Sequence, residues 1–109
     1  MLHKTLTQEK WDTYSTIQQL LSIGAEFGRA KNAITLNDNL EAGNSYLRAL
    51  ELLELTAGDK KWRNKLKEIL YLKEYLAWLW ITKNNDKDTC SLIYRTLLDI
   101  SPETSTLGF

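Results

Sequence analysis

The sequence predicts an all-α protein, an up-down four-helix bundle with three long helices and one shorter C-terminal helix. Proline occurs once, at Pro102, so no proline interrupts a helix anywhere in residues 1–101. In four segments of that stretch, apolar residues recur at spacings of three and four, which is the period of a helix with one buried face. The links between these segments are short, which favours antiparallel packing of consecutive helices.

Length and composition indicate one globular domain over residues 1–109, with flexible ends at about residues 1–5 and 102–109. Hydrophobic residues make up 43% and charged residues 26%, as in ordinary globular proteins. The most apolar stretch has 13 residues, 69–81, fewer than the roughly 20 that span a bilayer. The N-terminal segment lacks the apolar core of a signal peptide, and the single cysteine, Cys90, cannot form an intramolecular disulfide. We therefore expect a cytoplasmic protein without a membrane partner.

The first helix is expected to start at a capping signature formed by Thr5 and Gln8 and to run for about 25 residues. Gly24 and Gly28 fall inside this helix, where each glycine costs about 1 kcal/mol relative to alanine. We therefore expect another backbone to approach this helix closely at both glycines, although Gly28 is also compatible with a helix end.

Turn and capping residues bound the second helix. Asp38 and Glu41 form a capping signature that predicts a helix over about residues 39–57. Gly58 is expected to end this helix in the left-handed conformation, and Asp59 can cap the helix that follows. The connection is then about two residues long, so we expect a tight antiparallel hairpin.

The third helix is expected to begin near Lys60 and to end at the polar run of residues 84–86. A fourth helix follows over about residues 87–100, with its apolar residues on one side: Cys90, Ile93, Leu97 and Ile100.

Apolar residues occupy two opposite faces of the third predicted helix. At about 100° per residue, one face holds the expected core stripe: Trp62, Leu66, Ile69, Leu76 and Trp80. The nearly opposite face is aromatic, and toward the N-terminus it becomes basic: Tyr71, Tyr75 and Trp78, then Lys67, Arg63 and Lys60. A helix that is apolar on both sides needs to be covered on both sides.

Two arrangements would cover the aromatic face. In the first, Tyr71, Tyr75 and Trp78 form a subunit interface, because Tyr and Trp are enriched in interface hot spots. This arrangement predicts a homo-oligomer. In the second, the protein is a monomer with the third helix at its centre, and the fourth helix lies across Tyr71 and Trp78.

The start of the third helix is strongly basic, with five Lys or Arg side chains in eight positions: Lys60, Lys61, Arg63, Lys65 and Lys67. The helix macrodipole disfavours positive charge at this end. One interpretation is nucleic-acid binding, with these residues on phosphates and nearby aromatic rings stacked on bases. The other is a solvated face neutralised by Asp59, Glu54 and Glu68, which fits a net charge of zero from fourteen basic and fourteen acidic residues.

The sequence contains few residues for catalysis. His3 is the only histidine, so no positioned base is available to a Ser or Cys nucleophile or to a ribonuclease of the helical HEPN type. Zinc and di-iron sites need several Cys or His ligands, so we expect no metal and no cofactor. Glu51 and Glu54, with Glu26 or Glu74 facing them, match the Glu-x-x-Glu of magnesium-dependent nucleotide pyrophosphohydrolases, but the later Glu-x-x-Asp of those enzymes is absent.

Several stretches between about residues 11 and 76 form a distinctive pattern: Trp11-x-x-Tyr14-Ser15, Gln19-Leu20-x-x-Ile23-Gly24-x-Glu26, Arg29-Ala30-x-Asn32, Arg48-Ala49-Leu50-Glu51-Leu52-Leu53-x-Leu55-Thr56-x-x-Asp59, and Leu66-Lys67-Glu68-Ile69 with Glu74. The pattern resembles a group of small uncharacterised bacterial proteins, which implies a helical fold without implying a reaction. In size and helix count the chain is also similar to the four-helix bundles encoded in ribosomal RNA intervening sequences and to the accessory variability determinant of diversity-generating retroelements. The latter family implies a ring-forming accessory protein that binds nucleic acid and a reverse transcriptase.

Two functions are therefore expected from the sequence. The first is a non-enzymatic, self-associating accessory or scaffold module, open to a further protein partner. The second is a nucleic-acid-binding accessory subunit that uses the basic start of the third helix. A magnesium-dependent nucleotide pyrophosphohydrolase is a third alternative.

Overall fold

The computed structural model describes residues 6–82 and 87–100, which contain helices and no strands. The elements in chain order are α1 (Gln8–Asp12), α2 (Thr16–Thr35), α3 (Asn39–Ala57), the 3-10 helix η1 (Lys60–Lys65), α4 (Leu66–Thr82) and α5 (Lys87–Ile100). The prediction of an all-α protein is confirmed. The predicted flexible ends, His3 and the polar run at residues 84–86 lie outside the described residues.

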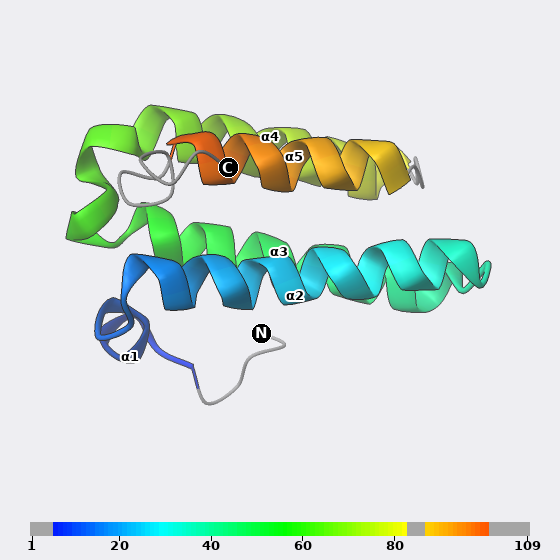
Figure 1. Cartoon of the computed structure of the whole chain (residues 1–109), viewed down its shortest axis with the longest axis horizontal. Helices are drawn as coiled ribbons and strands as arrows, with labels where there is room; N and C mark the ends of the chain where they lie inside the picture. Colours follow the sequence, from blue (N-terminus) through cyan, green and yellow to red (C-terminus); the bar gives the residue numbers. More distant parts are fainter. Residues whose placement is uncertain (1–5, 83–86, 101–109) are drawn as a thin grey trace.

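The four longer helices form two layers, α2 with α3 and α4 with α5, and each runs opposite to the one before it (Figure 1). α4 packs mainly against α3 and α5 mainly against α2, and α4 and α5 contact each other less closely. α2 contacts both α3 and α5, and α3 also contacts α4, so the described helices form one compact body of 36 × 33 × 20 Å. α1 lies beside the start of α2 and packs against the C-terminal end of α3.

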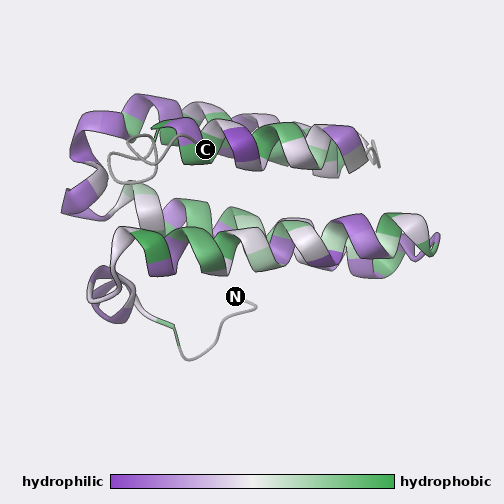
Figure 2. Ribbon diagram, in the orientation of Figure 1, coloured by the Kyte–Doolittle hydropathy of each residue, from purple (hydrophilic) through white to green (hydrophobic). Residues whose placement is uncertain are grey.

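The core is filled from every described helix. The largest fully buried apolar side chains are Trp11, Leu20, Ile23, Tyr46, Leu53, Trp62, Ile69, Leu76, Leu79 and Leu97. Figure 2 shows hydrophobic residues recurring along α2 to α5, whereas α1 and η1 are mostly hydrophilic. The bounds predicted for α3 and α5 are confirmed, and so is the inward side of α5, where Cys90, Ile93 and Leu97 are buried and Ile100 is half-buried.

The first long helix begins later than its apolar pattern predicts. Instead of one helix of about 25 residues, the short α1 is separated from α2 by a turn at residues 13–15. The hydroxyl of Ser15 accepts a hydrogen bond from the Gln18 amide at 3.1 Å, and Gln18 Oε1 accepts one from the Ser15 amide at 2.8 Å. This capping box starts a new helix, because an N-cap of this kind stabilises a helix start by about 1 kcal/mol.

Gly24 and Gly28 differ in what surrounds them. A Cβ on Gly24 would lie 2.5 Å from the Tyr94 ring of α5, so the predicted close approach exists but involves a side chain rather than a backbone. A Cβ on Gly28 would meet nothing within 4 Å, and α2 continues through this residue to Thr35. Neither expectation for Gly28 is therefore correct, and nothing in the structure explains this glycine.

Gly58 ends α3 as predicted, but in the right-handed conformation, with φ of −83°. The left-handed residue in the described chain is Asn37, with φ of 57°, in the link between α2 and α3. Gly58 leaves room for a side chain instead, because a Cβ there would collide with Gln8 Oε1 and the end of the Gln8 side chain would have to shift. The Gln8 side chain can then donate a hydrogen bond of 2.8 Å to the Leu55 carbonyl near the end of α3.

The third predicted helix begins as a 3-10 helix, which changes its core stripe. Ile69, Leu72, Leu76 and Leu79 of α4 are buried, whereas Leu66 and Trp80 of the predicted stripe are 40% and 38% exposed. A 3-10 helix turns about 120° per residue instead of about 100°, so the four steps from Trp62 to Leu66 add about 80° of rotation. Projecting one uniform α-helix from the buried Trp62 therefore gives the wrong phase for α4.

Candidate interaction surfaces

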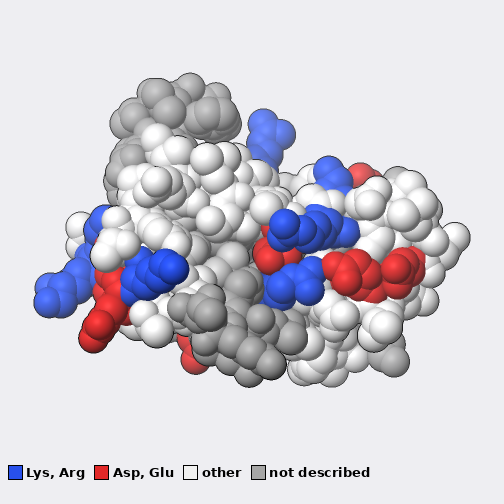
Figure 3. All heavy atoms as spheres, turned by 90° about the horizontal axis from the view of Figure 1, so that it is seen from below, with Lys and Arg blue, Asp and Glu red and all other residues white. Residues whose placement is uncertain are grey.

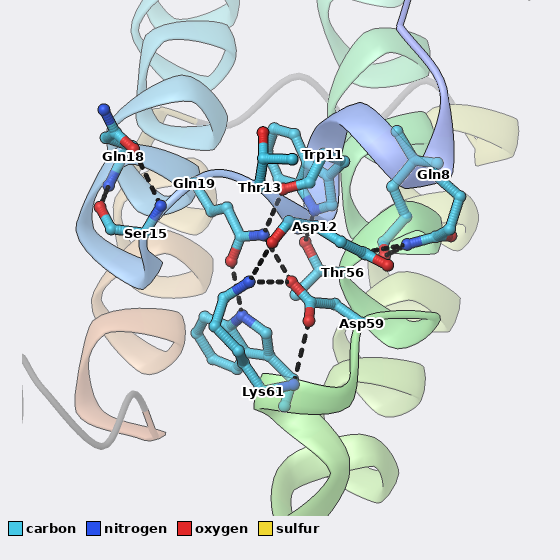
Figure 4. A network of polar contacts seen from close by, with 12 residues as sticks. Gln8, Trp11, Asp12, Thr13, Ser15, Gln18, Gln19, Thr56, Asp59 and Lys61 are labelled. Carbon is cyan, nitrogen blue, oxygen red and sulfur yellow. Dashed lines mark hydrogen bonds and ion pairs between the residues drawn. The ribbon is translucent and has the colours of Figure 1, made fainter.

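A buried polar network fixes the start of η1 against α1, α2 and α3 (Figure 4). The Gln19 amide nitrogen donates hydrogen bonds to Asp59 Oδ2 at 2.7 Å and to the Trp11 carbonyl at 3.0 Å. Gln19 Oε1 accepts a hydrogen bond of 2.8 Å from the Trp62 indole, and the Trp11 indole donates one of 3.2 Å to Thr56 Oγ1. Trp62 is thereby held in the core while the residues on either side of it face outward.

Lys61 belongs to this network and is not a free cation. Its ammonium group donates to Asp59 Oδ2 at 2.7 Å and to the Asp12 carbonyl at 2.8 Å, and its amide donates to Asp59 Oδ1. Burial opposes ionisation of Asp59, but hydrogen bonds from Lys61 and Gln19 outweigh it and hold the pKa of this carboxyl below its ordinary value. Lys61 is one of the predicted phosphate-binding residues, and its charge is therefore compensated within the chain.

The other four residues of the basic run have no acidic partner among the described residues. Lys60, Arg63 and Lys67 are exposed and Lys65 is half-buried. Local neutralisation by Glu54 and Glu68, considered above, is not seen: Glu54 instead approaches Lys73 at 4.0 Å. η1 thus presents three side chains with uncompensated positive charge, and Lys67 follows in the first turn of α4.

The aromatic face predicted on the third helix lies on the surface of the single chain. Tyr71 and Trp78 are 68% and 51% exposed, and Tyr75 is half-buried against the core. The rings of Tyr75 and Trp78 stack, with centroids 6.0 Å apart and an interplanar angle of 23°. The alternative in which the fourth helix covers Tyr71 and Trp78 is not what the structure shows, because α5 packs beside Tyr75 and leaves both side chains open.

An open groove between α4 and α5 borders the aromatic face. Its larger part, about 510 Å³, is lined by Lys67, Glu68, Leu70, Tyr71, Leu72, Glu74, Thr96 and Ile100. A second part of about 270 Å³ is lined by Tyr71, Leu72, Tyr75, Leu92, Ile93 and Thr96. The sequence interpretation missed Leu70, Leu92 and Thr96. Leu92 carries a usable signal, since it is an apolar residue off the buried stripe of α5 and is 59% exposed.

The carboxylates considered for magnesium do not come together. Glu26, which is 4% exposed, is bound at 3.0 Å by both Arg29 and Arg48, and hydrogen bonding to Glu26 raises the pKa of Arg48. On the face drawn in Figure 3, basic and acidic side chains lie next to one another. Among the described residues no three His, Cys, Asp or Glu side chains are grouped as metal ligands. The geometry therefore gives the pyrophosphohydrolase alternative no support.

None of the described helices combines the length and the apolar character needed to cross a membrane. Comparisons with protein families, curated proteins and solved structures find no match for this chain. The resemblances to small bacterial proteins and to retroelement accessory proteins therefore stay predictions.

Proposed function

We propose that the chain is a non-enzymatic, self-associating accessory or scaffold module of the cytoplasm, a four-helix bundle of α2 to α5 whose subunit interface contains Tyr71, Tyr75 and Trp78. The observation that carries this proposal is the exposure of Tyr71 and Trp78 on one face of α4, beside an apolar groove. The same surface extends through Leu70, Ile81 and Leu92, which are 43%, 70% and 59% exposed.

Burial of this surface supplies the driving force. Removing apolar area from water contributes about 25 cal/mol per Å², and large exposed apolar patches typically mark interaction sites. Tyr and Trp bring large area with few rotatable bonds, so ordering them at an interface costs little entropy. Tyr75 and Trp78 already stack on each other in the single chain, which lowers that cost further.

We propose a non-enzymatic role because the sequence lacks the residue types that a catalytic site needs. With His3 as the single histidine and Cys90 buried in the core, the chain has no evident nucleophile and base pair. An interaction module needs neither cofactor nor metal.

The proposal is tested by the mass of the protein in solution, measured by light scattering during size exclusion. The wild-type chain is expected to elute as an oligomer and Trp78→Glu as a monomer, because a charge at the interface has to be desolvated. Leu21→Glu is the matched control: Leu21 is 65% exposed on α2, away from α4, and its replacement should leave the mass unchanged. A monomeric wild-type protein, or a Trp78→Glu variant with the mass of the parent and a native circular dichroism spectrum, contradicts the proposal.

A second candidate function is nucleic-acid binding by an accessory subunit. It is favoured by the uncompensated side chains of Lys60, Arg63, Lys65 and Lys67. Each phosphate contact makes the affinity fall as salt rises, so anisotropy of labelled RNA and DNA should show a steep salt dependence. Replacement of Arg63 and Lys67 by Glu should abolish nucleic-acid binding, whereas Lys61→Gln should change the affinity little. No binding of either nucleic acid at low salt excludes this function.

A further inference from the structure

We propose that the partner on the aromatic face is a second copy of this chain, with the two α4 helices antiparallel about a twofold axis near Leu70 and Tyr71. In this arrangement Lys67 of each copy lies opposite Glu74 of the other. The inference rests on the self-association proposed above and specifies its geometry.

Four residues on the outer side of α4 carry the first step. Leu70 and Tyr71 each lie three or four residues from Lys67 and from Glu74, so the four residues share one face, and all four line the same groove. Lys67 and Glu74 are both exposed, and neither makes an ion pair with another described residue. One positive and one negative charge therefore flank an exposed apolar centre.

The position of the axis follows from the spacing. Lys67 and Glu74 lie equally far from the midpoint between Leu70 and Tyr71, about 5 Å along the helix on either side. A twofold axis at that midpoint places each charge opposite its counterpart and forms two opposite-charge pairs. A parallel arrangement would place Lys67 opposite Lys67 and Glu74 opposite Glu74, which is repulsive.

The antiparallel arrangement also suits the helix macrodipoles. The basic η1 of each copy lies along the C-terminal half of the other copy's α4, where the macrodipole is negative and the last turn of α4 has no basic residue.

A second copy fits this face better than an unrelated protein, because the pattern is complementary to its own reverse. From the N-terminal end, the face runs basic at Lys67, apolar at Leu70 and Tyr71, and acidic at Glu74, and reversing it brings the two charges opposite each other and the apolar centre opposite itself. This self-complementarity is what an isologous interface requires.

Charge exchange tests the geometry. Lys67→Glu and Glu74→Lys each replace both symmetry-related attractive pairs by repulsive ones, so each variant alone should show at least about a tenfold increase in the dimer Kd at low salt. A mixture of the two variants should form a heterodimer, because each repulsive surface is then matched by the other. The variant that carries both exchanges should recover the wild-type homodimer. Self-association is measured by sedimentation, and pairing between the variants by energy transfer between labelled chains.

Controls and outcomes separate this inference from the proposed function. Lys10→Glu and Glu9→Lys alter the net charge equally on the exposed surface of α1 and should leave the dimer Kd unchanged. A wild-type monomer overturns both the proposed function and the inference. A wild-type oligomer whose single variants assemble normally, or whose variants do not prefer each other in the mixture, overturns the antiparallel geometry alone. Preferred pairing of Lys67→Glu with the wild-type chain would indicate the parallel arrangement and also overturn it.

Discussion

Gln19 shows why particular polar residues are needed inside this molecule. Its amide donates to a carboxylate and a backbone carbonyl while it accepts from the Trp62 indole, which uses both donors and the acceptor. Neither a carboxylate nor an apolar side chain of similar size could make these three hydrogen bonds. Among the described residues no buried side-chain nitrogen or oxygen lacks a hydrogen-bond partner.

The two glycines in α2 predict opposite effects of the same substitution. Gly28→Ala is expected to raise the free energy of unfolding by about 0.5–1 kcal/mol, because a helical alanine is favoured over glycine and nothing lies within 4 Å. Gly24→Ala is expected to lower it by about 1–2 kcal/mol, because the new methyl group displaces the Tyr94 ring. Urea denaturation of both variants measures the difference.

A double-mutant cycle tests whether contact with Tyr94 is the reason that Gly24→Ala lowers the free energy of unfolding. The Tyr94 hydroxyl donates to the Leu20 carbonyl at 3.3 Å and the ring packs near Phe27, so its displacement loses both contacts. In a Tyr94→Ala background Gly24→Ala should become stabilising, like Gly28→Ala. If Gly24→Ala stays destabilising in that background, contact with Tyr94 is not the reason.

Asp59 predicts a loss of stability in acid. Its pKa is below the ordinary value of 3.8 in the folded chain, so the folded state favours the ionised carboxylate. The resulting stabilisation is fully present above the pKa of the unfolded chain and is lost as pH falls through the lower pKa of the folded chain. Asp59→Asn should therefore be less stable than wild type at pH 7, and its free energy of unfolding should depend less on pH below about 5. Urea denaturation between pH 2 and 7 tests this, with the exposed Glu9→Gln as control.

At the scale of elements, local signals define helix ends well where only one capping signature is present. Asp38 and Glu41 specify the start of α3, and the side chain of Asp38 does accept a hydrogen bond from the Glu41 amide at 3.1 Å. Near the N-terminus, the Ser15 signature follows shortly after the Thr5 signature, and apolar spacing continues through Trp11 and Tyr14 between them. Periodicity alone cannot place the break, because Trp11 is buried in either arrangement.

The phase of α4 could not be predicted because it depends on contacts made far along the chain. The 3-10 start follows from anchoring Trp62 to Gln19 and Lys61 to Asp59, and Gln19 comes from another helix. The outer position of Tyr71 and Trp78 was predictable nevertheless, because both lie nearly opposite the true core as well as the expected one. Thr96 was not, since no local pattern states which side of α5 faces α4, whereas Leu92 is marked as an apolar residue off the buried stripe of α5.

At the scale of the whole molecule, the distribution of charge matters more than its sum. The net charge is zero, and several charged side chains pair with one another within the chain. Examples are Lys61 with Asp59, and Arg48 with Glu26 and Glu41. The charges along η1 and α4 without ion-pair partners in the described part of the chain include the basic residues of η1 other than Lys61, Lys67 and Glu68 in the first turn of α4, and Glu74. Aromatic rings lie between Lys67 and Glu74 and beyond them. A second copy that meets this surface in reverse neutralises the charges and covers the rings together.

Coupling of folding to assembly predicts that thermal stability depends on protein concentration. If folded chains pair and unfolded chains do not, mass action raises the Tm as concentration rises. For a dimer of domains this size, a hundredfold increase in concentration should raise the Tm by about 5 °C. Trp78→Glu should melt at one temperature over the same range, whereas Leu21→Glu should follow the wild-type chain. Calorimetry provides the measurement, and an unchanged wild-type Tm over a range in which light scattering shows the mass changing would mean that unfolded chains associate as strongly as folded ones, which contradicts an interface built by the folded surface.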